Sequence, residues 1–353
     1  MDKKDVKVVL VRVREAVRST FFRRGGRLGR AMYRVFGTSH NREMNAVFSG
    51  AAEFYRVDRS RGQRFALRRH VHMLEKGLCM RPRRETFAVD YIETTVGDLR
   101  KCMAGNELSD IELKWCFDVL SAYFDATSTS PNARIRRARD EFLGLARPEV
   151  PIQESAPYEV GTLQDVVSIK ALEALAVSRT SVRSYHSKPV DRGAIDRALI
   201  VALESPSACN RVPWTMRIMD NPEDARLVAG VAMGTAGYSE QVSNVAVLVG
   251  NLGAYSNERD RHLIYIDGSL AAMSFILALQ AQGVSSCCVN WPDIGTREKK
   301  MASLLGLEQH ERVVMLILFG YADEQGLTPY SGKLPVDAIR TFGLPPGQSV
   351  TPG

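Results

Sequence analysis

The spacing of apolar and polar residues along the second half of the chain predicts a mixture of helices and strands. Apolar residues at helical spacing predict three helices, over residues 165–177, 191–204 and 267–283. Apolar runs predict buried strands over 245–249 and 313–321, and a shorter strand is predicted over 215–219. The helix over 267–283 has almost no polar face, so we expect it to be buried on all sides.

The first 150 residues show mostly helical spacing. Residues 6–22 mix apolar and basic positions as an amphipathic helix does, and helical spacing continues over 43–79 and 107–147. The residues expected in the core of the last segment are Trp115, Phe117, Val119, Leu120 and Phe124. The chain from 147 to 161 is rich in proline and lacks this spacing, so we place a domain boundary there. We therefore predict a helical, basic extension over 1–150 and a second domain over 165–343.

Basic residues are concentrated at the start of the chain. The protein has 353 residues and a formal net charge of +7, and residues 1–42 contain twelve Lys and Arg against three acidic residues. Such a segment is either a solvated helical surface or a weak contact for an anionic membrane or acidic polymer. We favour the solvated surface. We expect no nucleic-acid binding, because no aromatic residues are interleaved with the basic ones.

The chain shows no pattern typical of export, membrane insertion or metal binding. No apolar run reaches the roughly 20 residues that span a bilayer, and arginines interrupt the N-terminal apolar positions. We therefore expect a cytoplasmic protein with six reduced cysteines, in which Cys287 and Cys288 are buried rather than joined by a disulfide. His72 and Glu75 share a helical face, but no further ligand is evident, so we predict a surface or packing role and no metal site.

Two polar motifs stand on either side of the helix predicted over 191–204. The first, RTSVRSY over 179–185, places two arginines and two hydroxyls within five residues. A guanidinium fork and a hydroxyl suit the several acceptor oxygens of a phosphate. The second, PSACNRVPW over 206–214, is small and polar at its start, so a flat ring can approach the backbone there.

These motifs resemble the opening of the FMN-dependent nitroreductase family. Members begin with a basic R-x-S-x-(R/K) cluster and show P-S-x-x-N-x-Q-P-W one helix later, although Val212 stands here where the family usually has glutamine. The resemblance continues through Asp267-Gly268 and Gly320-Tyr321 and covers about residues 165–343. It implies an α+β fold with a small mixed sheet flanked by helices, here preceded by a mostly helical extension.

The resemblance also implies an FMN site assembled from distant segments. In the family the first motif and a basic residue near the C-terminus bind the phosphate, and a second basic residue stabilises the negative charge of the reduced flavin. A main-chain N–H from the segment equivalent to 286–291 donates to the redox-active ring nitrogen. The cofactor-binding residues implied here are Arg179, Thr180, Ser181, Arg183, Pro206, Ser207, Ala208, Cys209, Asn210, Cys288, Val289, Asn290 and Lys333. No catalytic side chain is implied, because the flavin carries out the chemistry.

By the same resemblance the protein is a homodimer. The long central helix forms much of the interface, and the turn 207–210 faces the flavin of the partner subunit. The leading function is NAD(P)H-dependent, ping-pong hydride transfer through FMN to a quinone, a nitroaromatic or another conjugated acceptor. Two alternatives stay open: a flavin-dependent dehydrogenase or oxidase of a specialised metabolite, and a flavin-lacking scaffold that docks on a membrane or an acidic polymer.

The sequence leaves the substrate open. Many relatives carry helices that cover the substrate between the positions of Trp214 and Asp267, and this interval is short here. We expect residues 43–150 to supply that cover, and between covering the site and docking we assign docking to residues 1–42. Ser331 stands where the first of two C-terminal basic residues is usual, which leaves Lys333 alone. The acceptor, the choice between NADH and NADPH and the direction of the reaction are undetermined.

Overall fold

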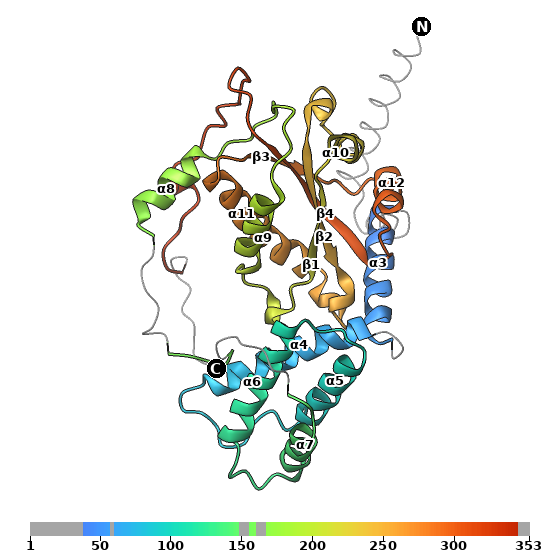
Figure 1. The fold of residues 1–353 in the computed structure, drawn as a ribbon, viewed down its shortest axis with the longest axis vertical. Helices are drawn as coiled ribbons and strands as arrows, with labels where there is room; N and C mark the ends of the chain where they lie inside the picture. Colours follow the sequence, from blue (N-terminus) through green and yellow to red (C-terminus); the bar gives the residue numbers. More distant parts are fainter. Residues whose placement is uncertain (1–37, 57–59, 148–154, 160–166, 345–353) are drawn as a thin grey trace.

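The computed structural model describes residues 38–56, 60–147, 155–159 and 167–344. The chain forms a small sheet covered by helices, with a bundle of further helices at one end (Figure 1). The helix predicted over 6–22 and most of the basic segment 1–42 lie outside the described residues, so both stay predictions.

The sheet consists of four antiparallel strands in the order β1-β2-β4-β3. They are β1 (Trp214–Met219), β2 (Asn244–Asn251), β3 (Ser285–Asn290) and β4 (Glu311–Gly320). The two central strands are the long apolar runs, which are buried on both faces. The α+β fold class is confirmed. We expected a mixed sheet. Among the described residues, parallel pairing is limited to an isolated bridge between Ser181 and Ser286.

Helices cover both faces of the sheet. On one face lie α9 (Arg192–Leu203) and α11 (Leu263–Ala281), and on the other lie α10 (Pro222–Ala229) and α12 (Gly295–Leu305). Successive residues of a strand point to opposite faces, so Ala246 and Leu248 pack toward α9 and α11. Val245, Val247 and Val249 pack toward α10 and α12. This alternation makes two separate apolar cores.

The helix bundle has an apolar core of its own. It consists of α4 (Ser60–Leu78), α5 (Ile92–Ala104), α6 (Asp110–Ala126) and α7 (Ala133–Leu143). The predicted core residues Phe117, Val119, Leu120 and Phe124 are buried. Trp115 is partly buried and packs against this core, and its indole N–H donates to Glu75 Oε1 at 2.8 Å.

The His72–Glu75 pair has the packing role that the sequence predicted. His72 Nδ1 lies 3.0 Å from Glu75 Oε2, and the other oxygen of Glu75 binds Trp115, so Glu75 joins α4 to α6. Glycine is required at position 77, because a Cβ there would lie 2.3 Å from the ring of Phe87. The contacts of this stretch are therefore those of helix packing.

The segment predicted as helical over 43–79 divides into two helices with different neighbours. The first, α3 (Thr38–Phe54), packs beside the sheet, where Ala46 contributes to a core with Leu252, Ala254, Tyr255 and Ile264. The second, α4, begins the bundle. The predicted division into 1–150 and 165–343 stays a prediction, and the structure adds that α3 packs on the second of these parts.

Helix α11 is not buried on all sides within one chain. Its residues Ile266, Leu270 and Met273 are 53%, 43% and 45% exposed. By length and composition alone, the stretch Glu258–Ala281 would also suffice to cross a membrane, whereas the apolar runs of the sequence predicted no membrane span. Half of the most apolar 18 residues of that stretch are buried inside the protein, where α11 forms one wall of the core.

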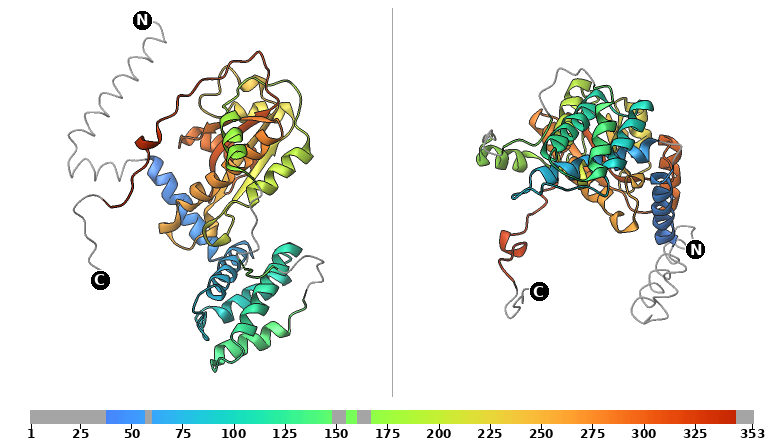
Figure 2. Two further views of the ribbon diagram at one scale, coloured as in Figure 1. Left: turned by 90° about the vertical axis from the view of Figure 1, so that its left-hand side faces the viewer. Right: turned by 90° about the horizontal axis from the view of Figure 1, so that it is seen from below.

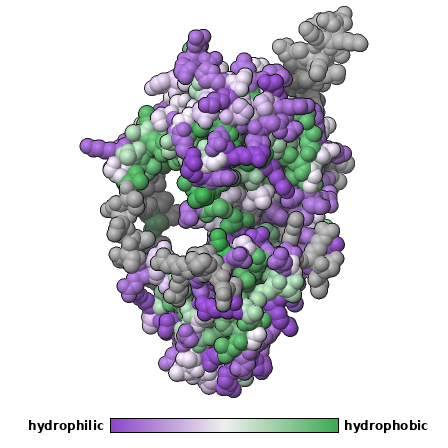
Figure 3. All heavy atoms as spheres, viewed as in Figure 1, coloured by the Kyte–Doolittle hydropathy of each residue, from purple (hydrophilic) through white to green (hydrophobic). Residues whose placement is uncertain are grey.

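Two further segments expose apolar residues beside α11. Helix α8 (Ile169–Ser178) has no buried residue. The C-terminal arm, residues 322–344, is bonded to the body through Asp323 and Thr328, and its later part extends away from the body (Figure 2). Apolar residues gather where α8 and α9 lie on the surface (Figure 3). The short 3-10 turns are η2 (Ala208–Asn210), η3 (Ser239–Gln241), η4 (Leu252–Ala254), η5 (Glu258–Asp260) and η6 (Val336–Ala338).

Candidate active site

The first polar motif runs along the outer edge of β3. Ser181 forms the parallel bridge with Ser286, and the N–H of Val182 donates to the carbonyl of Ser286 at 3.1 Å. The hydroxyl of Tyr185 donates to the carbonyl of Val182 at 2.6 Å and lies 3.3 Å from the carbonyl of Leu318. The motif is therefore held at both ends, by β3 and by β4.

Two arginines of this motif lie at the edge of β3 without acidic partners. Arg183 donates to the carbonyl of Ser181 at 3.1 Å and lies 5.9 Å from the ring centroid of Tyr238. Burial raises the pKa of the Cys287 thiol, while the charges of Arg183 and Arg179 and the Ser181 hydroxyl act in the opposite direction. Among the described residues no carboxylate forms an ion pair with either arginine. The donor set at this edge therefore suits a bound anion.

The edge strand β3 offers free backbone groups next to these cations. Amide and carbonyl groups of alternate residues point to the same edge of an antiparallel strand, and Ser286 already points outward to Val182. Cys288 and Asn290 follow at that spacing, so their N–H groups face outward. Their side chains are exposed, whereas those of Cys287 and Val289 are buried.

The expectation that both Cys287 and Cys288 are buried is therefore wrong for Cys288. All six cysteines are free thiols.

The second motif forms a tight turn, η2, at the far end of α9. Cys209 and Asn210 have φ angles of 55° and 50°, and Val212 has 50°, a region that a β-branched residue rarely adopts. Contacts from within the turn stabilise it, since the N–H of Val212 donates to Ser207 Oγ at 3.1 Å. The N–H of Ala208 donates to the carboxylate of Asp267 at 2.9 Å. Burial raises the pKa of Asp267, whereas the hydrogen bond from the Ala208 N–H and the charge of Arg211 act to lower it.

One chain does not bring the two motifs together. They stand at opposite ends of α9, whose 12 residues extend over about 18 Å. Arg179, Thr180, Ser181 and Arg183 lie with Cys288–Asn290, whereas Pro206–Asn210 lie beside α4. Lys333 lies on the exposed arm, five residues after Thr328, whose hydroxyl donates to Ser181 O at 3.1 Å. It makes no hydrogen bond or ion pair with another described residue.

The family that the motifs resemble is confirmed by comparison with known proteins. The sequence profile described as "Nitroreductase family" matches residues 176–249 and 242–321. This chain carries a nitroreductase-family domain. The domain spans both motifs and the whole sheet, and the match leaves α3 to α7 outside it.

Individual relatives match the same half of the chain. A Thermus thermophilus protein named "NADH dehydrogenase" is 27% identical over 195 residues, which are 46% of this chain and 92% of that protein. An "FMN-dependent Nitroreductase" of Clostridium difficile, whose structure is solved, is 19% identical and has a TM-score of 0.41 over 47% of this chain and 96% of its own. A nitroreductase family protein of Streptococcus pneumoniae has a TM-score of 0.42 and 23% identity over 49% and 100% of the two chains.

The sequence did not identify the residues that hold the second motif in place. Asp267 caps the turn from α11, and Arg68 of α4 donates from Nε to the carbonyl of Asn210 at 2.9 Å. Asp267 belongs to a motif that the resemblance included, whereas nothing in the sequence linked Arg68 to residue 210. Among the described residues one group of potential metal ligands, His186, Asp323 and Glu324, lies close together, with His186 and Glu324 exposed. The prediction of no metal site stays a prediction.

Proposed function

We propose that the protein is an FMN-dependent oxidoreductase that transfers a hydride from NAD(P)H to a quinone, a nitroaromatic or another conjugated acceptor. The observation that carries this proposal is the juxtaposition of unneutralised arginines, Arg179 and Arg183, with the free N–H groups of the β3 edge. That juxtaposition lies in a domain matched by the nitroreductase family. The name of the Thermus relative agrees with an NADH-linked reaction.

The donor set at this edge fits FMN. Arg179, Thr180 and Ser181 offer charged and hydroxyl donors to a phosphate, and we propose that Lys333 joins them from the arm, on which Thr328 bonds to Ser181 O. The N–H groups of Cys288 and Asn290 offer donors to a flat ring that lies against β3. When bound, FMN supplies hydride chemistry, and the chain supplies position and electrostatics. Arg183, fixed by Ser181 and Tyr238, offsets negative charge that develops on the ring.

The separation of the two motifs supports a site shared between two copies of the chain. The apolar residues exposed on α9 and α11 include Ile200, Leu203 and Leu270, at 61%, 57% and 43%. The C-terminal arm adds Leu327, Tyr330 and Phe342, each more than four-fifths exposed. An apolar surface of this kind marks an interface. In the proposed homodimer one chain contributes Arg179–Arg183 and β3, and the other contributes Ser207–Asn210.

The purified protein tests the proposal directly. We expect a yellow protein that releases FMN on denaturation and whose flavin is bleached by anaerobic NADH or NADPH. A colourless protein that does not bind added FMN would contradict the proposal and leave the scaffold alternative. Flavin that is reduced by an organic metabolite but not by either nicotinamide would favour the dehydrogenase or oxidase alternative. We further propose a cytoplasmic enzyme, because NAD(P)H is an intracellular donor and its cysteines are free.

A further inference from the structure

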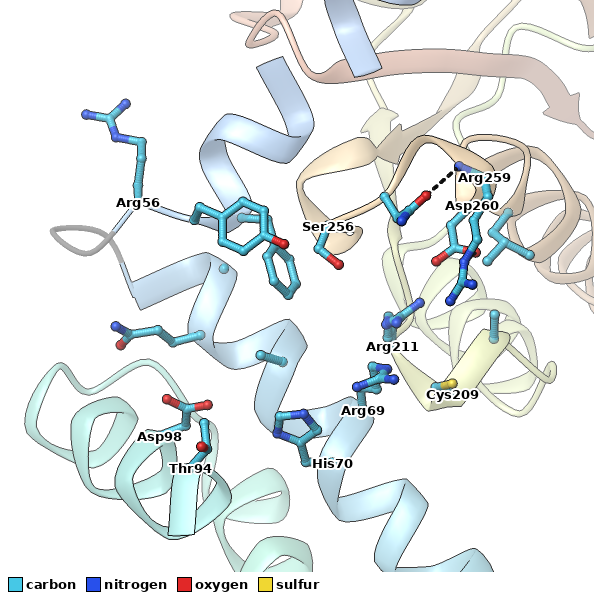
Figure 4. Close-up of a pocket in the computed structure, with 18 of the residues that line it drawn as sticks. Arg56, Arg69, His70, Thr94, Asp98, Cys209, Arg211, Ser256, Arg259 and Asp260 are labelled. Carbon is cyan, nitrogen blue, oxygen red and sulfur yellow. Dashed lines mark hydrogen bonds and ion pairs between the residues drawn. The ribbon is translucent and has the colours of Figure 1, made fainter. Parts of the chain in front are cut away.

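A cavity of about 590 Å³ lies beside the second motif, between the helix bundle and the nitroreductase domain. One wall comes from α4 and α5, with Arg69, His70 and Asp98 (Figure 4). The opposite wall comes from the nitroreductase domain, with Cys209, Arg211 and Arg259. We refer to it as the Arg69–Arg211 cavity. Because the first wall lies before residue 176, it is absent from the part of the chain that the family match covers.

Arg69 and Arg211 differ from the other cations of this cavity, because neither has an acidic partner among the described residues. Arg259 lies 3.8 Å from Asp260, and Lys101 lies 4.0 Å from Asp98. No carboxylate of the described residues lies within ion-pair distance of Arg69 or Arg211. Figure 4 shows these two side chains next to each other, reaching the cavity from α4 and from the end of the second motif. Two adjacent guanidinium groups repel each other unless an anion lies between them.

Arg211 has the geometry of a preformed anion donor. It is 6% exposed, its Nε has no hydrogen-bond partner among the described residues, and its guanidinium lies 4.9 Å from the ring centroid of Tyr255. The nearby carboxylate of Asp267 accepts from the N–H of Ala208. A buried, unpaired charge is costly, so a protein that keeps one in a cavity generally pairs it with a ligand.

His70 adds a neutral polar group on the other wall. Its ring stacks on Tyr91 at 5.3 Å, and its Nδ1 is buried without a hydrogen-bond partner among the described residues. Burial, followed by the charges of Arg69 and Arg211, lowers the pKa of His70 to about 4. The imidazole is therefore neutral at pH 7 and adds no further positive charge. It offers one hydrogen bond to a ligand that the two arginines hold by charge.

Part of the remaining lining is apolar, although Gln63, Thr94, Ser256 and Asn257 also line the cavity. Phe54 and Tyr55 pack edge to face at 5.3 Å, and Ala66 and Leu263 also line the cavity. A ligand that fits both regions has an apolar body and one compact oxyanion. An oxyanion held between Arg69 and Arg211 would lie next to Cys209. Cys209 is in the turn that the proposed function places against the flavin of the partner subunit.

We propose that the Arg69–Arg211 cavity binds the acidic group of the electron acceptor, which is therefore a conjugated organic acid bearing a carboxylate or a phosphate. This inference rests on the proposed function, which identifies the flavin site next to this cavity as a redox site. The helices before the family domain then select the substrate, because Arg69 and His70 come from α4.

The test compares 4-nitrobenzoate with nitrobenzene, two acceptors that differ only in the carboxylate. We expect a higher kcat/KM for 4-nitrobenzoate in the parent, and a ratio of the two values that falls by about tenfold to a hundredfold in Arg69→Gln. Arg226→Gln, an exposed arginine on α10, is the matched control and keeps the parent's ratio. Arg211→Lys, which retains the charge, keeps part of the preference. We expect inorganic phosphate to inhibit 4-nitrobenzoate reduction competitively. Comparing kcat/KM for a phosphorylated acceptor with that for 4-nitrobenzoate shows whether the cavity prefers a phosphate or a carboxylate.

A binding measurement separates failure of this inference from failure of the proposed function. We expect 4-nitrobenzoate to raise Tm of the flavin-loaded parent more than nitrobenzene does, and to lose this advantage in Arg69→Gln. A parent without preference for the acid in binding and kinetics would overturn the inference, even if it contained FMN. An effect of Arg69→Gln on the KM of NADPH alone would also overturn it. A colourless protein that still binds the acid through Arg69 would overturn only the proposed redox function.

Discussion

Arg68 Nε donates to the carbonyl oxygen of Asn210 at 2.9 Å, which joins the helix bundle to the second motif of the nitroreductase domain. The same guanidinium binds Glu112 of α6 at 2.8 Å and lies 5.2 Å from the ring centroid of Trp115. Asn210 lies in a turn whose backbone adopts rarely populated angles. External contacts are needed to keep such a turn in one conformation. Through this hydrogen bond the bundle helps to hold the turn in position.

Removing Arg68 should reduce activity through the turn. We expect Arg68→Met to lower kcat/KM for nitrobenzene and to weaken FMN binding, because the carbonyl of Asn210 loses its donor. Arg64→Met is the matched control: Arg64 binds the same carboxylate, Glu112 Oε1, at 2.7 Å but does not contact the turn. Both variants should lower the stability of the bundle, whereas FMN affinity should fall only in Arg68→Met. Equal FMN affinity in the two variants would contradict the positioning role.

Arg179 should contribute directly to FMN affinity. It caps α8 beside Ser181, where no acidic side chain of the described residues neutralises it. We expect Arg179→Ala to weaken FMN binding by about 1.5–3 kcal/mol, the usual scale for a hydrogen bond to a charged group. Fluorescence titration of the apoprotein with FMN measures the change. Arg192→Ala, an exposed arginine on α9, controls for the loss of net charge, and an unchanged affinity in Arg179→Ala would remove Arg179 from the site.

The sequence predicted those parts of the fold and the site whose residues form a continuous pattern within one short stretch. The strands β2 and β4 are unbroken apolar runs, and the motif around Arg179 concentrates phosphate-binding groups in one stretch. By contrast, β3 reads SSCCVN, and α5 contains two threonines, a valine and a glycine, so neither has a strong local preference. The Arg69–Arg211 cavity was not predictable, because its arginines are 142 positions apart and meet only in the folded chain.

Two glycines distinguish the packing of α3 from that of the bundle. A Cβ at Gly50 in α3 would lie 2.7 Å from the backbone of Leu252, whereas a Cβ at Gly97 in α5 would meet nothing within 4 Å. Gly→Ala in a helix normally stabilises by about 0.5–1 kcal/mol. We expect Gly97→Ala to raise Tm and Gly50→Ala to lower it, because the clash displaces α3 from the sheet. Equal shifts in urea or thermal unfolding would show that α3 does not depend on this contact.

The stability of the bundle should depend on pH through Glu112. Burial by itself would raise the pKa of Glu112, but Arg64 and Arg68 outweigh it and hold this pKa below its usual range. A carboxylate whose pKa is lower in the folded state stabilises the protein above its unfolded pKa of about 4.3 and loses this effect as pH falls. We expect Glu112→Gln to lower Tm at pH 7, with a difference from the parent that disappears toward pH 3. A difference that stays constant with pH would exclude the charge as its cause.

The exposed face of α11 should hold the flavin site together through the dimer. Leu270 is 43% exposed on the helix that carries Asp267, whose carboxylate caps the turn of the second motif. A glutamate at this position places a charge in the proposed interface, where it cannot remain hydrated, so we expect Leu270→Glu to be a monomer. We also expect it to lose its flavin, because one chain keeps Arg179 and Asn210 at opposite ends of α9. Leu227→Glu is the matched control, since Leu227 is 49% exposed on α10, which covers the other face of the sheet. Sedimentation with detection at flavin wavelengths measures mass and cofactor together, and a flavin-loaded monomer at micromolar concentration, in the parent or in Leu270→Glu, would contradict the shared site.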